Sequence, residues 1–418
     1  MKTTLRSYRK VPKWIRSMRE EVAPRIIDLR RKTVRATHNN SSLLPVTLEY
    51  QGFILKVISD VSRKLAGECG IKINDVIGYE QGGIARQTCT PASDLDLNIV
   101  YPESHFAVYH PFEKNLIQAL SIVLGMSADD IHNNEINQLP LSVIKRLPER
   151  ISSSRSIRRG MIYELRRQAG RRNIITVGGF DLLNLYSWAA LRDPIVFRES
   201  GLYRSRDFSA GYKRQHQAWD ILTRKFIFGN EEQYYEIERE FYDAIDVDLA
   251  TKNLPLALKR LAESKDRIRV PADISNLEKV ELYAKKDGGS QRGFQLMFLL
   301  GFSGIAGDKT SIPVTYTDFL ECQAIPDILG ERLGSQLFVA LDWLIKARAI
   351  TTIYLSGGPD LPVLGHFSRG SSNNVEIDEQ VLDVFRVPHI EALYEALMTH
   401  RAIIKTAIDN TRETFSAI

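Results

Sequence analysis

The chain of 418 residues lacks the features of a membrane or secreted protein. No stretch approaches the roughly 18 uninterrupted apolar residues of a membrane-spanning helix, and the first residues carry no apolar segment of the secretory type. Cysteine is scarce: Cys69, Cys89 and Cys322 are scattered along the chain, so they form neither a disulfide framework nor a Cys-x-x-Cys metal site. We therefore predict a cytoplasmic protein that does not act in a membrane.

Several enzyme signatures are also missing. The chain contains no Walker A motif, no Gly-x-Gly-x-x-Gly after a strand and no signature of a Ser/His/Asp triad. Its eight histidines are dispersed without the spacing of a zinc site. A P-loop NTPase, a dinucleotide-binding dehydrogenase and a zinc hydrolase are therefore poor interpretations of this sequence.

Positive charge is unevenly placed. Residues 1–40 hold twelve Lys or Arg against three carboxylates, which is +9 in a chain whose net charge is only +5. A second basic run spans residues 155–172. Such segments permit a polyanionic partner such as RNA, and they are equally typical of a solvated helix face. Both interpretations remain open at this point.

The periodicity of apolar residues divides the chain into a part with alternating strands and helices and a part that is mainly helical. It predicts helices over 13–37, 46–68 and 111–125, and strands within 73–83 and 93–101, around Ile131 and over 174–177. Such alternation of strand and helix is typical of an α/β unit. After about residue 205 helical patterns dominate, beginning with 213–228, and the clearest strand signal is 351–355. We predict a basic helical arm over 1–45, an α/β core over 46–204 and a mainly α-helical domain over 205–418.

The segment from residue 82 to residue 97, GGIARQTCTPASDLDL, carries the chemistry. Asp94 and Asp96 are two apart in an expected strand, so both carboxylates face one side, where they suit a divalent cation such as Mg²⁺ or Mn²⁺. The Gly82-Gly83 pair lets the backbone approach a triphosphate, Arg86 offers a planar fork of donors, and Ser93 either bonds phosphate or caps the turn.

This combination resembles the nucleotidyltransferase signature of the DNA polymerase β superfamily. The spacing of Gly82-Gly83-x-x-Arg86 and Pro91-x-Ser93-Asp94-x-Asp96-Leu97 is similar to the N-terminal part of bacterial protein-PII uridylyltransferases. A weaker similarity lies at 181–197, and another at 288–292, which resembles that family's Gly-Gly-Leu-Arg-Asp element with one residue inserted. The resemblance implies a small mixed sheet with flanking helices in the core and a helical substrate-binding domain after it.

The resemblance also implies a reaction. The protein would transfer NMP from an NTP, such as ATP or UTP, to a protein side chain or a small molecule and release pyrophosphate. Asp94 and Asp96 would hold the metal, while Gly82, Gly83, Arg86 and Ser93 would bind the triphosphate. The His-Asp dipeptide of that family's hydrolase domain is absent, so we expect the transferase portion only.

Two questions remain open in the sequence. A third catalytic carboxylate has several candidates, of which Asp130 and Asp181 are carried forward beside Asp129 and Glu135. Lys285 and Arg292 either bind triphosphate or belong to the solvated surface. The alternative functions are a catalytically silent NTP-binding regulatory module and a transferase directed at RNA or at cyclic-nucleotide synthesis.

Overall fold

The helices of the N-terminal part pack side by side. The computed structural model describes residues 11–80, 82–100, 106–128, 131, 223–244, 255, 258, 261, 277–285, 289–303, 312–365 and 375–416. The three helices expected at 13–37, 46–68 and 111–125 are confirmed as α1 (Lys13–His38), α2 (Leu44–Glu68) and α3 (Phe106–Leu124). Each turns an apolar stripe toward one core, in which Ile26, Leu29 and Ile54 are fully buried.

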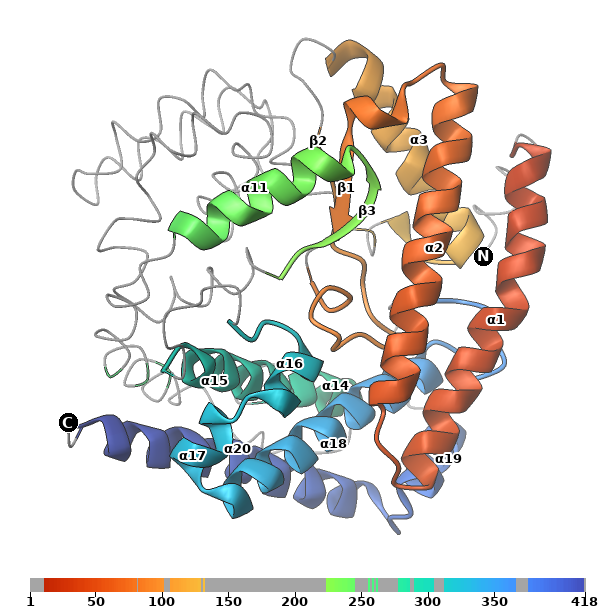
Figure 1. The fold of residues 1–418 in the computed structure, drawn as a ribbon. Helices are drawn as coiled ribbons and strands as arrows, with labels where there is room; N and C mark the ends of the chain where they lie inside the picture. The colour runs from red at the N-terminus through yellow and green to blue at the C-terminus, as the bar shows by residue number, and fades with distance from the viewer. Residues whose placement is uncertain are drawn as a thin grey trace, which may run out of the picture.

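A three-stranded antiparallel sheet lies beside these helices (Figure 1), in the order β2-β1-β3. Its strands are β1 (Ile77–Glu80), β2 (Leu97–Val100) and β3 (Lys225–Gly229), and the 3-10 turn Ile73–Asp75 leads into β1. The two strands expected within 73–83 and 93–101 are confirmed. Parallel pairing among the described residues is confined to one bridge, between Leu95 and Ile131.

The third strand comes from a segment for which the sequence predicted a helix. Residues 225–228 of the expected helix 213–228 form β3, so that prediction is wrong there. The segment Lys-Phe-Ile-Phe-Gly is rich in aromatic and β-branched residues, and pairing with β1 gives its backbone the partners that a helix would otherwise supply. Phe228 occupies the space over Gly78, where any side chain would collide with its ring.

The C-terminal half is a helical layer with a second hydrophobic core (Figure 1). Its helices are α14 (Leu277–Lys285), α15 (Ser290–Ser303), α16 (Tyr316–Glu321), α17 (Ala324–Leu329), α18 (Glu331–Leu355), α19 (Val375–Phe385) and α20 (Ile390–Ser416). Helix α11 (Glu231–Ala244) lies instead beside the sheet, where it contacts β3. Helix α18 runs through the middle of this layer and contacts α14, α17 and α20. No described helix is both long and apolar enough to cross a membrane.

The strand expected at 351–355 is the last part of α18, so that prediction is wrong. Three of its five residues are β-branched, which favours a strand when the segment is considered alone. In the structure the hydroxyls of Thr351 and Thr352 donate to the carbonyls of Ala347 and Arg348 at 2.7 and 2.9 Å. The residues are buried among neighbouring helices, and this burial outweighs the local preference.

Helix α1 connects the two halves of the molecule through a buried arginine. The Arg30 guanidinium is fully buried and donates to the carbonyls of Val363, Ile353 and Gly358 at 2.6–2.8 Å, and also to Ser356 Oγ. It therefore caps the carboxyl end of α18 and the loop that follows. Four further cations of the same helix contact acceptors within the chain: Arg19, Arg25, Arg31 and Lys32. Five cations of the expected basic arm thus contact acceptors within the chain.

Candidate active site

The glycine pair forms a tight turn at the end of β1. The Arg86 amide donates to the Gly82 carbonyl at 3.0 Å, and the Thr88 amide donates to the Gly83 carbonyl at 2.8 Å. Gly82 lies against Asp96, and a Cβ at Gly82 would overlap the Asp96 carboxylate. Gly82 is therefore required for close approach between the turn and the acidic segment, not for an unusual backbone angle.

Asp94 and Asp96 line the same cavity, as their spacing predicts. The intervening Leu95 and the following Leu97 are 0% and 2% exposed and belong to the N-terminal core. The alternation of core-facing leucine and cavity-facing aspartate follows from the period of two in an extended chain. The leucines thus anchor this segment in the core, and the aspartates present paired carboxylates to the cavity.

A third carboxylate lies behind Asp96, and the sequence did not single it out. Glu80 ends β1, is fully buried, and accepts a hydrogen bond of 2.6 Å from the Ala85 amide. Burial raises the Glu80 pKa to about 8, with the negative charge of Asp96 as the next cause. Its second oxygen, Oε1, has no hydrogen-bond partner among the described residues. Glu80 therefore braces the glycine turn from inside and lies outside the set of residues that line the cavity.

Two cations from the helical half form ion pairs with Asp94. Arg348 of α18 places Nη2 3.4 Å from Asp94 Oδ1 and Nε 3.3 Å from Glu281 Oε1. Lys285, at the end of α14, places Nζ 3.8 Å from Asp94 Oδ2. The positive charge of Arg348 lowers the Lys285 pKa, and burial adds to this effect. One carboxylate is thus held by two cations from helices that lie almost 200 residues or more further along the chain.

These groups enclose a cavity of about 100 Å³ between the sheet and the helical half. Arg86 and Ser93 line it, as predicted, and so do Ser290 and Gln291 at the start of α15. Ser93 Oγ accepts a hydrogen bond of 3.0 Å from the Thr90 amide, so of its two expected roles the structure shows the cap of the turn. The weaker sequence similarity at 288–292 therefore falls at the same cavity.

The paired aspartates have the chemistry of a Mg²⁺ or Mn²⁺ site. Hard carboxylate oxygens on one cavity wall suit such a cation, which typically takes one or two protein carboxylates and completes its shell with water and substrate phosphates. The described residues contain no cluster of three potential metal ligands. Asp130 and Asp181, the expected third carboxylates, lie outside the described residues, as do Asp129 and Glu135.

Sequence reasoning missed Glu80 and Arg348 and left Lys285 undecided. Glu80 precedes the glycine pair by two residues, and its only local signal was a charged side chain at the end of an apolar strand. Arg348 lies in a long, largely buried helix, and no motif around it marks it as a site residue.

No family model matches the chain, and no curated protein shows a significant match to it.

Proposed function

We propose that the protein is a Mg²⁺- or Mn²⁺-dependent nucleotidyltransferase that moves NMP from an NTP to an acceptor and releases pyrophosphate. The observation that carries this proposal is the convergence on one cavity of Asp94, Asp96, the Gly82–Gly83 turn and the cations Lys285 and Arg348. Paired carboxylates facing cations across a small cavity match the charge pattern of a metal-bound triphosphate. The resemblance of the 82–97 segment to nucleotidyltransferases points to the same reaction.

The cations have a specific role in this proposal. A cavity of about 100 Å³ is smaller than the roughly 300 Å³ at which ligand pockets of drug size begin. A nucleotide therefore enters by separating Lys285 and Arg348 from Asp94. The two cations then exchange a carboxylate partner for phosphate oxygens, and Asp94 becomes available to the metal. Arg348 suits bidentate contact with phosphate because its guanidinium is planar, whereas Lys285 acts as a point charge.

The other residues position the reacting groups. The bound metal supplies charge neutralisation at the phosphates and a template for their orientation. Asp94 and Asp96 hold the metal, the backbone of Gly82 and Gly83 approaches the triphosphate, and Arg86 reaches the same cavity. Glu80 keeps the turn in place from behind. Catalysis then follows from in-line positioning and charge stabilisation without a covalent intermediate. The acceptor is a protein side chain or a small molecule.

The test uses the full chain with each of four α-labelled NTPs, Mg²⁺ or Mn²⁺, and cell lysate as a source of acceptor. We expect Asp94→Asn and Asp96→Asn each to lower label transfer by at least about 10²-fold, because each removes a metal ligand. Asp60→Asn is the matched control, since Asp60 pairs with Lys56 on the exposed face of α2. Undiminished transfer in both active-site variants would exclude the proposed mechanism.

One observation favours a second candidate, a silent NTP-binding module. In the structure Asp94 is already neutralised by Lys285 and Arg348, an arrangement that suits phosphate binding without turnover. NTP binding in the presence of Mg²⁺ without pyrophosphate release would identify this alternative. The RNA-directed alternative receives less support, because Arg19, Arg25 and Arg30 of the basic arm contact acceptors within the chain.

A further inference from the structure

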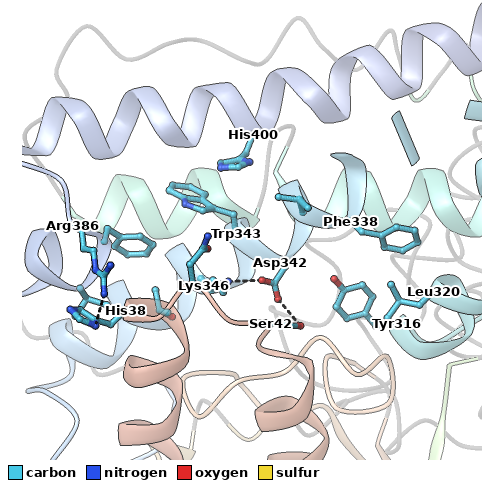
Figure 2. A pocket seen from close by; sticks show the side chains of 15 residues that line it. His38, Ser42, Tyr316, Leu320, Phe338, Asp342, Trp343, Lys346, Arg386 and His400 are labelled. Carbon is cyan, nitrogen blue, oxygen red and sulfur yellow. Dashed lines mark hydrogen bonds and ion pairs between the residues drawn. The ribbon is translucent and has the colours of Figure 1, made fainter. Parts of the chain in front are cut away.

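A second and larger cavity, of about 710 Å³, lies on another face of α18 (Figure 2). Its walls come from the end of α1 and the loop after it, from α16, and from α18, α19 and α20. Asp342, Trp343 and Lys346 face this cavity, whereas Ile345 and Arg348 of the same helix face the candidate active site. The volume is within the range of small-molecule pockets. The cavity is therefore separate from the site assigned to nucleotide transfer.

Aromatic rings form both ends of this cavity (Figure 2). At one end Trp343 stacks on His400, with ring centres 4.6 Å apart and an interplanar angle of 22°, and Phe385 lies 5.5 Å from Trp343. At the other end Tyr316 and Phe338 are nearly parallel, with centres 6.4 Å apart. Flat aromatic surfaces of this kind favour a ligand with a planar ring.

The floor between these ends is polar, with donor groups in excess. The Asp342 carboxylate is satisfied by the Leu43 amide at 2.9 Å, by Ser42 Oγ and by Lys346 Nζ at 2.7 Å. The Lys346 ammonium carries three donors, is 4% exposed, and has Asp342 as its one acceptor among the described residues. Arg386 adds a second cation at the rim, where its Nη2 lies 3.3 Å from His38 Nδ1. A buried ammonium with unused donors is costly unless a ligand supplies an acceptor, and an anion forms the strongest hydrogen bonds with it.

We propose that this cavity binds a small molecule that combines a flat aromatic ring with a carboxylate or phosphate group. The ring lies against Trp343 and Phe385, and the anionic group contacts Lys346, with Arg386 at the entrance. Net positive charge at the site, from Lys346 and Arg386 against Asp342, sets the preference for an anion. The inference does not require that the protein transfers nucleotides.

The same cavity connects directly to the glycine turn. Tyr316 lines it, and the Tyr316 amide donates to the Arg86 carbonyl at 3.0 Å. The amide and hydroxyl of Thr317 both donate to Gln87 Oε1, at 3.0 and 2.5 Å, and Gln87 has a φ of 58°. Phe294 lines the active-site cavity and packs edge-on against the Tyr316 ring. Trp343 and Phe338 both belong to α18, and Phe338 stacks on Tyr316 of α16. A ligand that shifts α18 against α16 therefore acts on the turn, so the cavity is suited to an effector.

The binding test uses two probes of similar shape, 1-naphthoate and the neutral 1-naphthalenemethanol, titrated calorimetrically into the full chain at pH 7. We expect naphthoate to bind more tightly than the alcohol. Lys346→Met should weaken naphthoate by about tenfold or more and leave the alcohol nearly unchanged, because it removes a charge-assisted hydrogen bond. Lys56→Met is the control, since Lys56 is an exposed lysine on α2.

A second variant guards against misfolding of the first. Val339 lines the cavity and is 62% exposed, so Val339→Glu alters the local charge without disturbing a core. We expect Val339→Glu to weaken naphthoate binding several-fold and to leave binding of the alcohol unchanged. Val339→Lys should strengthen naphthoate binding. Equal affinity for the two probes, or affinities insensitive to the Lys346 and Val339 substitutions, would overturn the proposed anion site.

The connection to the turn is tested by hydrogen exchange with and without saturating naphthoate. We expect changed protection at the amides of Arg86, Thr88 and Tyr316, whereas amides in the middle of α2 should not change. The measurement needs no nucleotide, so its result is independent of whether the transferase assignment holds. Unchanged exchange over residues 84–88 and 316–318 under full occupancy would refute the coupling.

Discussion

At Gly82 the backbone leaves no room for a side chain, because a Cβ there would overlap the Asp96 carboxylate. We predict that Gly82→Ala displaces Asp96 and lowers nucleotidyl transfer by about 10²-fold, the scale of loss for a misplacement of about 1 Å. Gly52→Ala in α2 is the control, since a Cβ there would meet no atom within 4 Å. Steady-state transfer rates measure both. Equal losses in the two variants would contradict the role given to Gly82.

His400 makes a residue-scale prediction about pH. Burial against Trp343, with the nearby charge of Lys346 as a lesser cause, lowers the His400 pKa from 6.5 to about 4. The unfolded chain therefore protonates His400 more readily than the folded chain does. The contribution of neutral His400 to folding stability is complete above pH 6.5 and is lost as the pH falls toward 4. The slope of the unfolding free energy against pH stays below about 1.4 kcal/mol per pH unit, because a single proton is involved. The Tm should fall less between pH 7 and pH 5 in His400→Phe than in the wild-type chain, as measured by thermal unfolding.

At the scale of elements, Arg30 decides how α1 meets α18. Removing its guanidinium leaves several carbonyls at the end of α18 without their donor, and an unsatisfied buried group costs about 1–3 kcal/mol. We predict that Arg30→Met lowers the free energy of unfolding by about 3 kcal/mol or more. Arg31→Met is the control, because Arg31 pairs with Asp360 on the surface, where such pairs contribute about 0–1 kcal/mol. Denaturant titration compares them, and similar midpoints for the two variants would refute the capping role.

The elements also show where local sequence preference was sufficient. The long amphipathic helices were predictable because 13–37, 46–68 and 111–125 each carry an apolar stripe of helical period. Residues 225–229 and 351–355 were not, since each is a short apolar segment compatible with either state. A strand partner, β1, determines the first segment, and burial within the helical layer determines the second.

At the scale of the whole molecule, the candidate active site lies between two hydrophobic cores. One core belongs to the N-terminal helices and the other to the helical layer, and the sheet contributes side chains to both. A nucleotide that contacts Asp94 from one side and Arg348 from the other should stabilise both. At a concentration of 100 times Kd we expect about 2.7 kcal/mol of stabilisation and a rise in Tm of roughly 3 °C.

The measurement is thermal unfolding with each NTP, with Mg²⁺ and with EDTA. Arg348→Met should lose most of the rise, because the variant lacks one phosphate contact and one link between the two halves. Lys279→Met, on the same layer but outside the residues that line the cavity, serves as the control. A full rise in Tm with EDTA present would argue against a metal-bound nucleotide at this site.

The candidate site was predictable only where it is contiguous in the sequence. Gly82, Gly83, Arg86, Ser93, Asp94 and Asp96 lie within 15 residues, so their spacing alone indicated a shared site. In the structure all of them line the cavity except Gly82, which lies against Asp96. Glu80 became evident only from its burial behind Asp96. Lys285 and Arg348 became evident only from their contacts with Asp94.

The sequence by itself thus determined the amphipathic helices and the spacing of the glycine turn and its two aspartates, because periodicity and short-range spacing are properties of neighbouring residues. Tertiary structure decided which distant cations neutralise Asp94, which strand completes the sheet and which rings enclose the second cavity. Those outcomes depend on long-range packing around α18, where a helix of 25 residues presents one face to the active site and another to a separate pocket.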